Sequence, residues 1–160
     1  MTNPSYLAPY APTPQDVVER MIRLAAVQAT DTVYDLGCGD GRLVITAALA
    51  CGAMGVGVDL DVARVEESRA NAFRLGVADR VRFEHADAFA IDLTPATVVF
   101  LYLRHSTTPM MAAHLLRHVR PGTRIVSHTF PIPFLTPAAV DAFVDAQGTS
   151  RAIHLWVVTE

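Results

Sequence analysis

The sequence predicts an α/β fold: a Rossmann-like, doubly wound and mostly parallel sheet with a C-terminal antiparallel hairpin. From residue 30 onward, short apolar stretches alternate with longer stretches of helical periodicity, and the connections between them are short. The apolar stretches are continuous, which is typical of parallel strands that are buried on both faces. Apolar residues make up 51% of the 160 residues and charged residues 18%, so the chain has enough apolar side chains to form a core of its own.

The expected elements follow one another without a linker or repeat, so we expect one domain over 1–160. Four prolines predict an extended segment over 1–14, and apolar periodicity predicts an amphipathic helix over 15–29. The β/α core is expected over 30–130. Its expected strands are Thr32–Leu36, Gly55–Val58, Val81–Glu84, Thr97–Leu103 and Arg124–His128. Its expected helices are Arg42–Ala50, Val62–Leu75 and Pro109–Val119.

Residues 131–160 are expected to close the sheet. Val140–Val144 and Ala152–Val158 flank a Gln-Gly-Thr-Ser turn, which predicts an antiparallel hairpin. A helix over Pro137–Ala146 is the alternative.

The most informative motif, Asp35-Leu36-Gly37-Cys38-Gly39-Asp40-Gly41, lies between the first strand and its helix. Glycines there let backbone N–H groups approach a ligand at a helix N-terminus. A dinucleotide-binding loop has the spacing Gly-x-Gly-x-x-Gly, whereas here the third glycine comes one residue earlier. The carboxylates of Asp35 and Asp40 would repel a pyrophosphate and attract the ammonium group of an aminoacyl sulfonium ligand. The loop therefore favours S-adenosylmethionine over NAD.

Acidic residues also follow the next two strands. Asp59, followed by Leu60, stands where a carboxylate accepts hydrogen bonds from both ribose hydroxyls. Asp87, followed by Ala88, is expected to accept from the adenine amino group, with Phe89 near the ring. Since the carboxyl ends of parallel strands meet at one edge of the sheet, these residues and the glycine loop predict one cofactor pocket. The alternative is that Asp59 and Asp87 only cap the segments that follow them.

The order of these motifs resembles that of the class I, seven-strand S-adenosylmethionine-dependent methyltransferases. Four stretches resemble more closely the small lysine methyltransferases related to the mitochondrial enzymes that act on ATP synthase c-subunit and adenine nucleotide translocase. These stretches are Tyr10-Ala11-Pro12-Thr13-Pro14, the Asp-Leu-Gly-Cys-Gly-Asp-Gly-Arg run at 35–42, Ser68-Arg69, and Arg120–His128. The nucleosomal histone lysine methyltransferase without a SET domain is a more distant likeness.

The resemblance implies that residues 1–14 fold over the cofactor as a lid, with Tyr10 and Thr13 contacting its aminocarboxylate end. It also implies methyl transfer to a protein lysine. Two departures concern the substrate: the targeting or anchoring N-terminus of the mitochondrial relatives is missing here, and the stretch 101–105 differs from theirs. The alternatives are a small-molecule acceptor, or an S-adenosylmethionine-binding module without catalysis.

The acceptor is expected at the end of the fourth strand. A lysine amine must lose its proton before methylation, and desolvation beside an aromatic wall lowers its pKa. Tyr102 is the expected wall and His105 the expected proton relay, with His128 and Phe130 nearby; the alternative places Tyr102 in the core. The Asn/Asp-Pro-Pro-Tyr/Phe motif that enzymes methylating adenine or glutamine carry after this strand is missing, which makes those acceptors unlikely.

Charge and composition argue against several other classes of function, namely nucleic-acid binding, metal binding and insertion into a membrane. The net charge is −3 and all 13 basic residues are arginines, so no nucleic-acid partner is expected. Cys38 and Cys51 are expected to be free thiols, and His114 and His118, four residues apart, lack a third metal ligand, so no metal site is expected. The sequence shows no signal peptide and no apolar run of bilayer length, which predicts a cytoplasmic protein, and its oligomeric state is left open.

Overall fold

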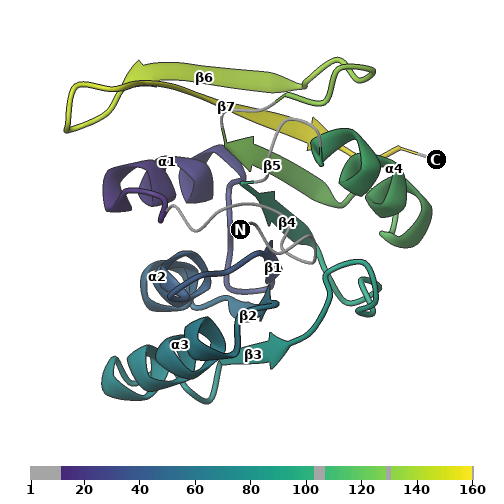
Figure 1. Ribbon diagram of the computed structural model, residues 1–160. Helices are drawn as coiled ribbons and strands as arrows, with labels where there is room; N and C mark the ends of the chain where they lie inside the picture. Colours follow the sequence, from purple (N-terminus) through teal and green to yellow (C-terminus); the bar gives the residue numbers. More distant parts are fainter. Residues whose placement is uncertain (1–11, 103–106, 129–130, 160) are drawn as a thin grey trace, which may run out of the picture.

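The computed structural model describes residues 12–102, 107–128 and 131–159 (Figure 1). Strands form one seven-stranded sheet in the order β3-β2-β1-β4-β5-β7-β6. The parallel strands are β1 (Thr32–Leu36), β2 (Met54–Asp59), β3 (Val81–His85), β4 (Val98–Leu101) and β5 (Arg124–His128). The hairpin of β6 (Ala139–Val144) and β7 (Ser150–Val157) joins antiparallel through the β5–β7 pair. The predicted fold class is confirmed.

Helices cover both faces of the sheet (Figure 1). One face packs against α1 (Gln15–Leu24), α2 (Arg42–Cys51) and α3 (Val62–Arg74), and the other against α4 (Thr108–His118). Strand β4 shows why the strands are continuous apolar runs. Phe100 belongs to the first core and its neighbour Leu101 to the second, so successive side chains are buried on opposite faces.

The expected helix over 15–29 is too long. It ends at Leu24, because Ala26 takes a left-handed conformation with φ 51° and the Val27 N–H donates to the carbonyl of Ile22. This is a Schellman-type end, which closes a helix by satisfying its last carbonyls.

Strand β4 is shorter than the expected Thr97–Leu103. Its partner β1 ends at Leu36, opposite Leu101, and turns into the glycine loop, so Tyr102 has no strand partner on that side. At the other end, the Thr97 hydroxyl donates to Asp31.

The C-terminal hairpin is confirmed, and the alternative helix over Pro137–Ala146 is wrong. Along β6, half-buried residues alternate with exposed ones such as Val140 and Val144, which is the period of a strand. The other element boundaries agree with the expected ones to within two residues. Among the helices that the structure describes, none has the length and apolar character needed to cross a lipid bilayer.

A buried ion pair holds the amino-terminal edge of the sheet. Asp31, just before β1, accepts hydrogen bonds from Arg124 Nη2 of β5 (2.7 Å), the Gln28 N–H (2.7 Å) and the Thr97 hydroxyl (2.8 Å). Burial alone would raise the pKa of Asp31, but these three donors outweigh it and lower the pKa below its usual value. Asp31 therefore connects the starts of three strands as an anion.

We expect Asp31→Asn to lower the free energy of unfolding at neutral pH by about 2 kcal/mol, because Arg124 loses its charged partner. The folded pKa lies below the unfolded one, so ionised Asp31 stabilises the fold above about pH 4, and this contribution is lost as the pH falls through the folded pKa. Urea unfolding of both proteins between pH 3 and pH 8 measures it. Glu84→Gln, which breaks the exposed Arg82–Glu84 pair, is the control and should change little. Equal effects of the two substitutions would contradict the prediction.

Candidate active site

The strand register brings the predicted site residues to one edge of the sheet. Leu36 is paired with Val58 on one side and with Leu101 on the other, and Leu101 with Ser127. The residues at or just past the carboxyl ends of the strands therefore follow one another across the sheet as His85, Asp59, Gly37, Tyr102 and His128. The chain order reverses between β1 and β4, and ligands of open α/β sheets bind at such a switch point.

The glycine loop is pinned at this edge. The backbone N–H groups of Gly37 and Cys38 both donate to the Val58 carbonyl, at 2.8 and 2.9 Å. Gly37 and Gly41 have φ 91° and 83°, a region that glycine adopts without strain. A Cβ on Gly41 would meet the Phe83 ring at 2.8 Å, whereas a Cβ on Gly37 would have no described atom within 4 Å. The open side of the backbone is therefore at Gly37.

Asp35 is a buried acid beneath this loop. It is 8% exposed, and its carboxylate has no hydrogen bond to any residue that the structure describes. Burial raises its pKa well above the usual value, and repulsion from Asp59 and Asp40 adds to the effect. A cationic ligand group at this edge would offset that repulsion, which fits the ammonium and sulfonium of S-adenosylmethionine.

Asp40, by contrast, already has a cationic partner. Arg42 donates to it from Nη2 (2.6 Å) and Nε (3.0 Å), so the pKa of Asp40 is lowered although burial acts in the other direction. Arg42 Nη1 also donates to the carbonyl of Thr13, which connects the end of the N-terminal segment to the glycine loop. The structure thus places Thr13 and Asp40 at the same arginine.

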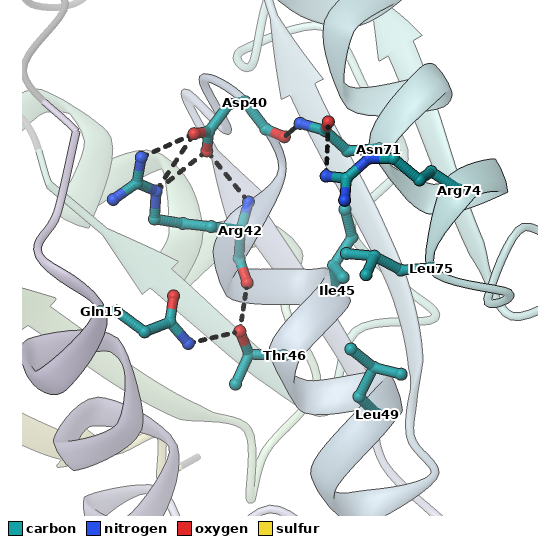
Figure 2. Close-up of a pocket in the computed structure, with 9 residues that line it drawn as sticks. All are labelled: Gln15, Asp40, Arg42, Ile45, Thr46, Leu49, Asn71, Arg74 and Leu75. Atoms are coloured by element: carbon teal, nitrogen blue, oxygen red, sulfur yellow. Dashed lines mark hydrogen bonds and ion pairs between the residues drawn. The ribbon is translucent and has the colours of Figure 1, made fainter.

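Figure 2 shows Asp40 and Arg42 at the top of a groove of about 320 Å³ that runs along α2 between α1 and α3. Its walls are formed by Gln15, Asp40, Arg42, Ile45, Thr46, Leu49, Asn71, Arg74 and Leu75. The groove meets the glycine loop at Asp40 and Arg42, while its other lining residues lie on or next to α1, α2 and α3, away from the strand tips that carry Asp59 and Tyr102.

Asp59 links the second strand to the loop. Its Oδ2 accepts from the Gly39 N–H (3.0 Å) and its Oδ1 from the Asp61 N–H (2.9 Å). The residue that caps α3 is Asp61, which accepts from the Ala63 N–H, so the capping alternative for Asp59 is wrong. The next residue, Leu60, has its carbonyl 3.0 Å from His85 Nε2.

Asp87 is exposed, and its Oδ1 accepts from the Phe89 N–H at 2.9 Å. Asp87 therefore closes the turn after β3, which is the local role that the capping alternative gave it. Ala88 is buried in the second core, and the Phe89 ring makes an edge contact with His114, with 5.2 Å between centroids. Among the residues with a described placement, no group of three or more side chains is arranged to hold a metal ion.

Two side chains of α3 that the sequence analysis did not assign to the site anchor the loop. The Ser68 hydroxyl, fully buried, donates to the Gly39 carbonyl (2.7 Å), and Asn71 Nδ2 donates to the Asp40 carbonyl (3.0 Å). The sequence carried a signal for them: two polar residues three apart on a helix face that is otherwise buried through Val65 and Ala72.

Tyr102 is half-buried at the tip of β4 and belongs to neither apolar core. Its ring packs on that of His128, which is fully buried, with centroids 4.2 Å apart and planes tilted by 31°. Of the other predicted site residues, Tyr10 and His105 lie outside the described residues, as does Phe130.

Comparison with known proteins identifies the family. The family model described as the ANTKMT methyltransferase domain matches residues 35–139, which span the end of β1, the glycine loop, the other four parallel strands and the first residue of β6. The chain belongs to this methyltransferase family. Family membership and the relatives described next confirm the predicted family, the predicted fold class and the predicted S-adenosylmethionine-dependent methyltransferase activity.

Some relatives of this methyltransferase are named as lysine methyltransferases, and one is named as an RNA methyltransferase. It is 39% identical over 153 residues to a protein-lysine N-methyltransferase of Saccharolobus islandicus, covering 95% of this chain and 94% of the relative. It is 32% identical to the mouse adenine nucleotide translocase lysine N-methyltransferase, covering 89% of this chain but 60% of that protein. A crystal structure titled an RNA methyltransferase from Salinibacter ruber, in complex with S-adenosyl-L-homocysteine, is 43% identical, with a TM-score of 0.87 and coverage of 94% and 95%.

Because Ser68 fixes the Gly39 carbonyl, we expect Ser68→Ala to weaken S-adenosylmethionine binding to the methyltransferase by about tenfold, the equivalent of one lost hydrogen bond of about 1.4 kcal/mol. Calorimetric Kd values measure it. Ser150→Ala, at an exposed position of β7, is the matched control and should keep the wild-type Kd. If Ser68→Ala also binds as wild type does, the anchoring role is wrong.

Proposed function

We propose that this methyltransferase transfers the methyl group of S-adenosylmethionine to the side-chain amine of a protein lysine. The observation that carries the proposal is the near full-length similarity to the Saccharolobus lysine N-methyltransferase, together with an aromatic wall at the acceptor end of the site. When bound, the cofactor supplies an electrophilic methyl group and a good leaving group. The chain has to bind it, place the acceptor in line with it and exclude water.

Residues at different strand tips would bind different parts of the cofactor. Asp59 would hold the ribose hydroxyls, with Leu60 beside it, and Asp87 and Ala88 would lie at the adenine end next to β3. Asp35, the buried acid without a hydrogen-bond partner among the described residues, would face the ammonium end.

At the methionine end, the backbone would pass closest to the ligand at the open face of Gly37, while Gly39 and Gly41 shape the turn. Asp40 would act through Arg42, which connects it to the Thr13 carbonyl and so fixes the end of the lid segment 1–14. Tyr10 and Thr13 are proposed to contact the aminocarboxylate from that segment.

The acceptor would enter beside Tyr102, because Tyr102 follows β4 next to Gly37, and its side chain is half-buried and belongs to neither apolar core. A lysine amine packed against this ring loses water, and desolvation lowers its pKa toward the deprotonated form that attacks the methyl group. His105 is proposed to accept the proton that the amine releases.

RNA is the second candidate acceptor, because the Salinibacter protein with that title is 43% identical to this chain. Charge favours lysine. The net charge is −3, and at least six of the 13 arginines form ion pairs with carboxylates, so at most seven are left to neutralise phosphates. The proposal includes a one-domain enzyme working in the cytoplasm, which the unpaired thiols of Cys38 and Cys51 support.

We expect Asp59→Asn to raise the Kd for S-adenosylmethionine by at least tenfold, because the ribose hydroxyls and the Gly39 N–H lose a charged acceptor. Asp61→Asn is the matched control: an asparagine still caps α3, so the Kd should stay within about twofold of wild type. Titration calorimetry of both variants tests the assignment. Unchanged binding by Asp59→Asn would remove Asp59 from the pocket.

The acceptor class is tested with methyl-tritiated cofactor and cell lysate, followed by separation into protein, RNA and small-molecule fractions. We expect label in protein, located on lysine by mass spectrometry. Label only in RNA or only in small molecules would replace the proposed acceptor, and binding without transfer would indicate a non-catalytic module.

With the labelled acceptor in hand, we expect Tyr102→Phe and Tyr102→Ala to keep the Kd for the cofactor and to lower kcat, the alanine variant by about a hundredfold because the amine loses its wall. Loss of cofactor binding instead would place Tyr102 in the cofactor pocket or the core.

A further inference from the structure

A buried chain of polar side chains runs from the C-terminal hairpin to Tyr102. Asp145, 6% exposed, accepts from Arg151 Nε at 2.9 Å, and Arg151 Nη1 lies 3.2 Å from His128 Nε2. His128 in turn packs its ring on that of Tyr102. Each residue comes from a different segment: the β6–β7 turn, β7, the end of β5 and the end of β4.

The sheet register explains how these segments meet. His128 is paired with Ile153 on β7, and Arg151, two residues before Ile153, has its side chain on the same face. On the other side, Leu101 is paired with Ser127, which sets Tyr102 beside His128. This series of side-chain contacts therefore crosses three neighbouring strands, β7, β5 and β4, on one face of the sheet.

The hairpin turn is organised to present Asp145. The Asp145 Oδ1 atom accepts from the Gln147 and Thr149 N–H groups, both at 2.9 Å, which leaves Oδ2 for Arg151. Asp16, in the first turn of α1, accepts from the Ala146 N–H and holds the same turn against the helix. Arg151 thus bridges two groups: its Nε donates to the Asp145 carboxylate, and its Nη1 lies within hydrogen-bond distance of the His128 imidazole. We call this bridging guanidinium the Arg151 fork.

The fork determines the protonation of His128. Arginine only donates, so Nε2 of His128 accepts and the ring proton is on Nδ1, which is buried without a partner among the described residues. Burial and the charge of Arg151 lower the pKa of His128 to about 4, against the smaller opposing effect of Asp145. Helix α1, which packs on this face, buries only apolar side chains, and Tyr102 contacts the ring from β4.

We infer that Asp145, Arg151 and His128 are positioning residues: the ring of His128, held by Arg151 and Asp145, fixes the ring of Tyr102 at the acceptor end of the site. The inference rests on the proposed function, in which Tyr102 lines the acceptor. An uncharged ring beneath Tyr102 suits an amine that has to be neutral when it attacks, because a cation there would oppose the charge that develops on the methylated nitrogen. The hairpin would thereby control turnover without touching the cofactor.

The test uses Arg151→Met, which keeps the length of the side chain but removes the fork. Histidine ring signals of isotope-labelled enzyme, with His128 assigned by its absence in His128→Gln, should show His128 neutral down to pH about 4 in the wild type. In Arg151→Met its titration midpoint should move up toward the ordinary value of about 6.5. With the acceptor identified by tritium labelling, kcat at pH 8 should fall by about tenfold, and further below pH 6.5, while the Kd for S-adenosylmethionine stays as in wild type.

Arg20→Met is the matched control, because Arg20 forms an equally short ion pair with Asp141 of the same hairpin (2.9 Å) but has no contact with His128. It should leave the titration of His128 and kcat unchanged. If Arg151→Met does not fold, Arg151→Lys replaces it: one ammonium keeps the charge near Asp145 but not the fork, so kcat should fall while His128 stays neutral.

The inference is overturned if a folded Arg151 variant keeps the wild-type kcat, or if Arg151→Met leaves the His128 titration where it is in the wild type. A failure of the proposed function is a different result: the wild-type enzyme then methylates no lysine, while the His128 titration still responds to Arg151→Met.

Discussion

The site depends on how the first two parallel strands end. The Val58 carbonyl of β2 accepts the N–H groups of both Gly37 and Cys38, so the β1–β2 ladder continues into the glycine loop and fixes its first turn. From there the Gly39 N–H meets Asp59, and Ser68 and Asn71 hold the carbonyls on the outer side. The backbone groups of the loop are satisfied by α3 and β2, which leaves the face at Gly37 open to a ligand. A loop of this kind is preorganised, and binding does not have to pay for ordering it.

The carboxylates around the loop divide into compensated and uncompensated charges. Asp40 is held by an arginine and Asp59 by two N–H groups, while Asp35 is buried without such partners among the described residues. Burial raises the pKa of Asp35 well above its usual value and repulsion from Asp59 and Asp40 adds to this, so a cationic ligand nearby would stabilise the ionised carboxylate. The carboxylates at these strand tips therefore favour a cationic ligand over an anionic one.

Local patterns predicted most of the fold, and the residues that they assign to the cofactor lie along one edge of the sheet. The glycine spacing and the acids at 35 and 59 are signals within one βαβ unit, where a motif and its geometry are contiguous in the chain. The errors were also local in origin: the left-handed Ala26 ended α1 early, although alanine favours helices, and the partner strand β1 ended β4. The role of Asp87 in its own turn was present in the sequence only as the less specific alternative.

What the sequence did not predict depends on contacts between distant segments. Arg151 and His128 are 23 positions apart and meet only because β7 joins the sheet antiparallel to β5, and Thr13 and Arg42 meet across 29 positions. No residue type or spacing in the sequence predicts such a long-range contact, since an arginine in a strand has many possible partners. The antiparallel hairpin thus does more than close the edge of the sheet: because β7 lies between β5 and β6, Arg151 reaches hydrogen-bond distance of His128, whose ring packs on Tyr102. The family match covers the glycine loop and the parallel strands from the end of β1 onward, and the hairpin adds its contacts to the sheet on the side of β5.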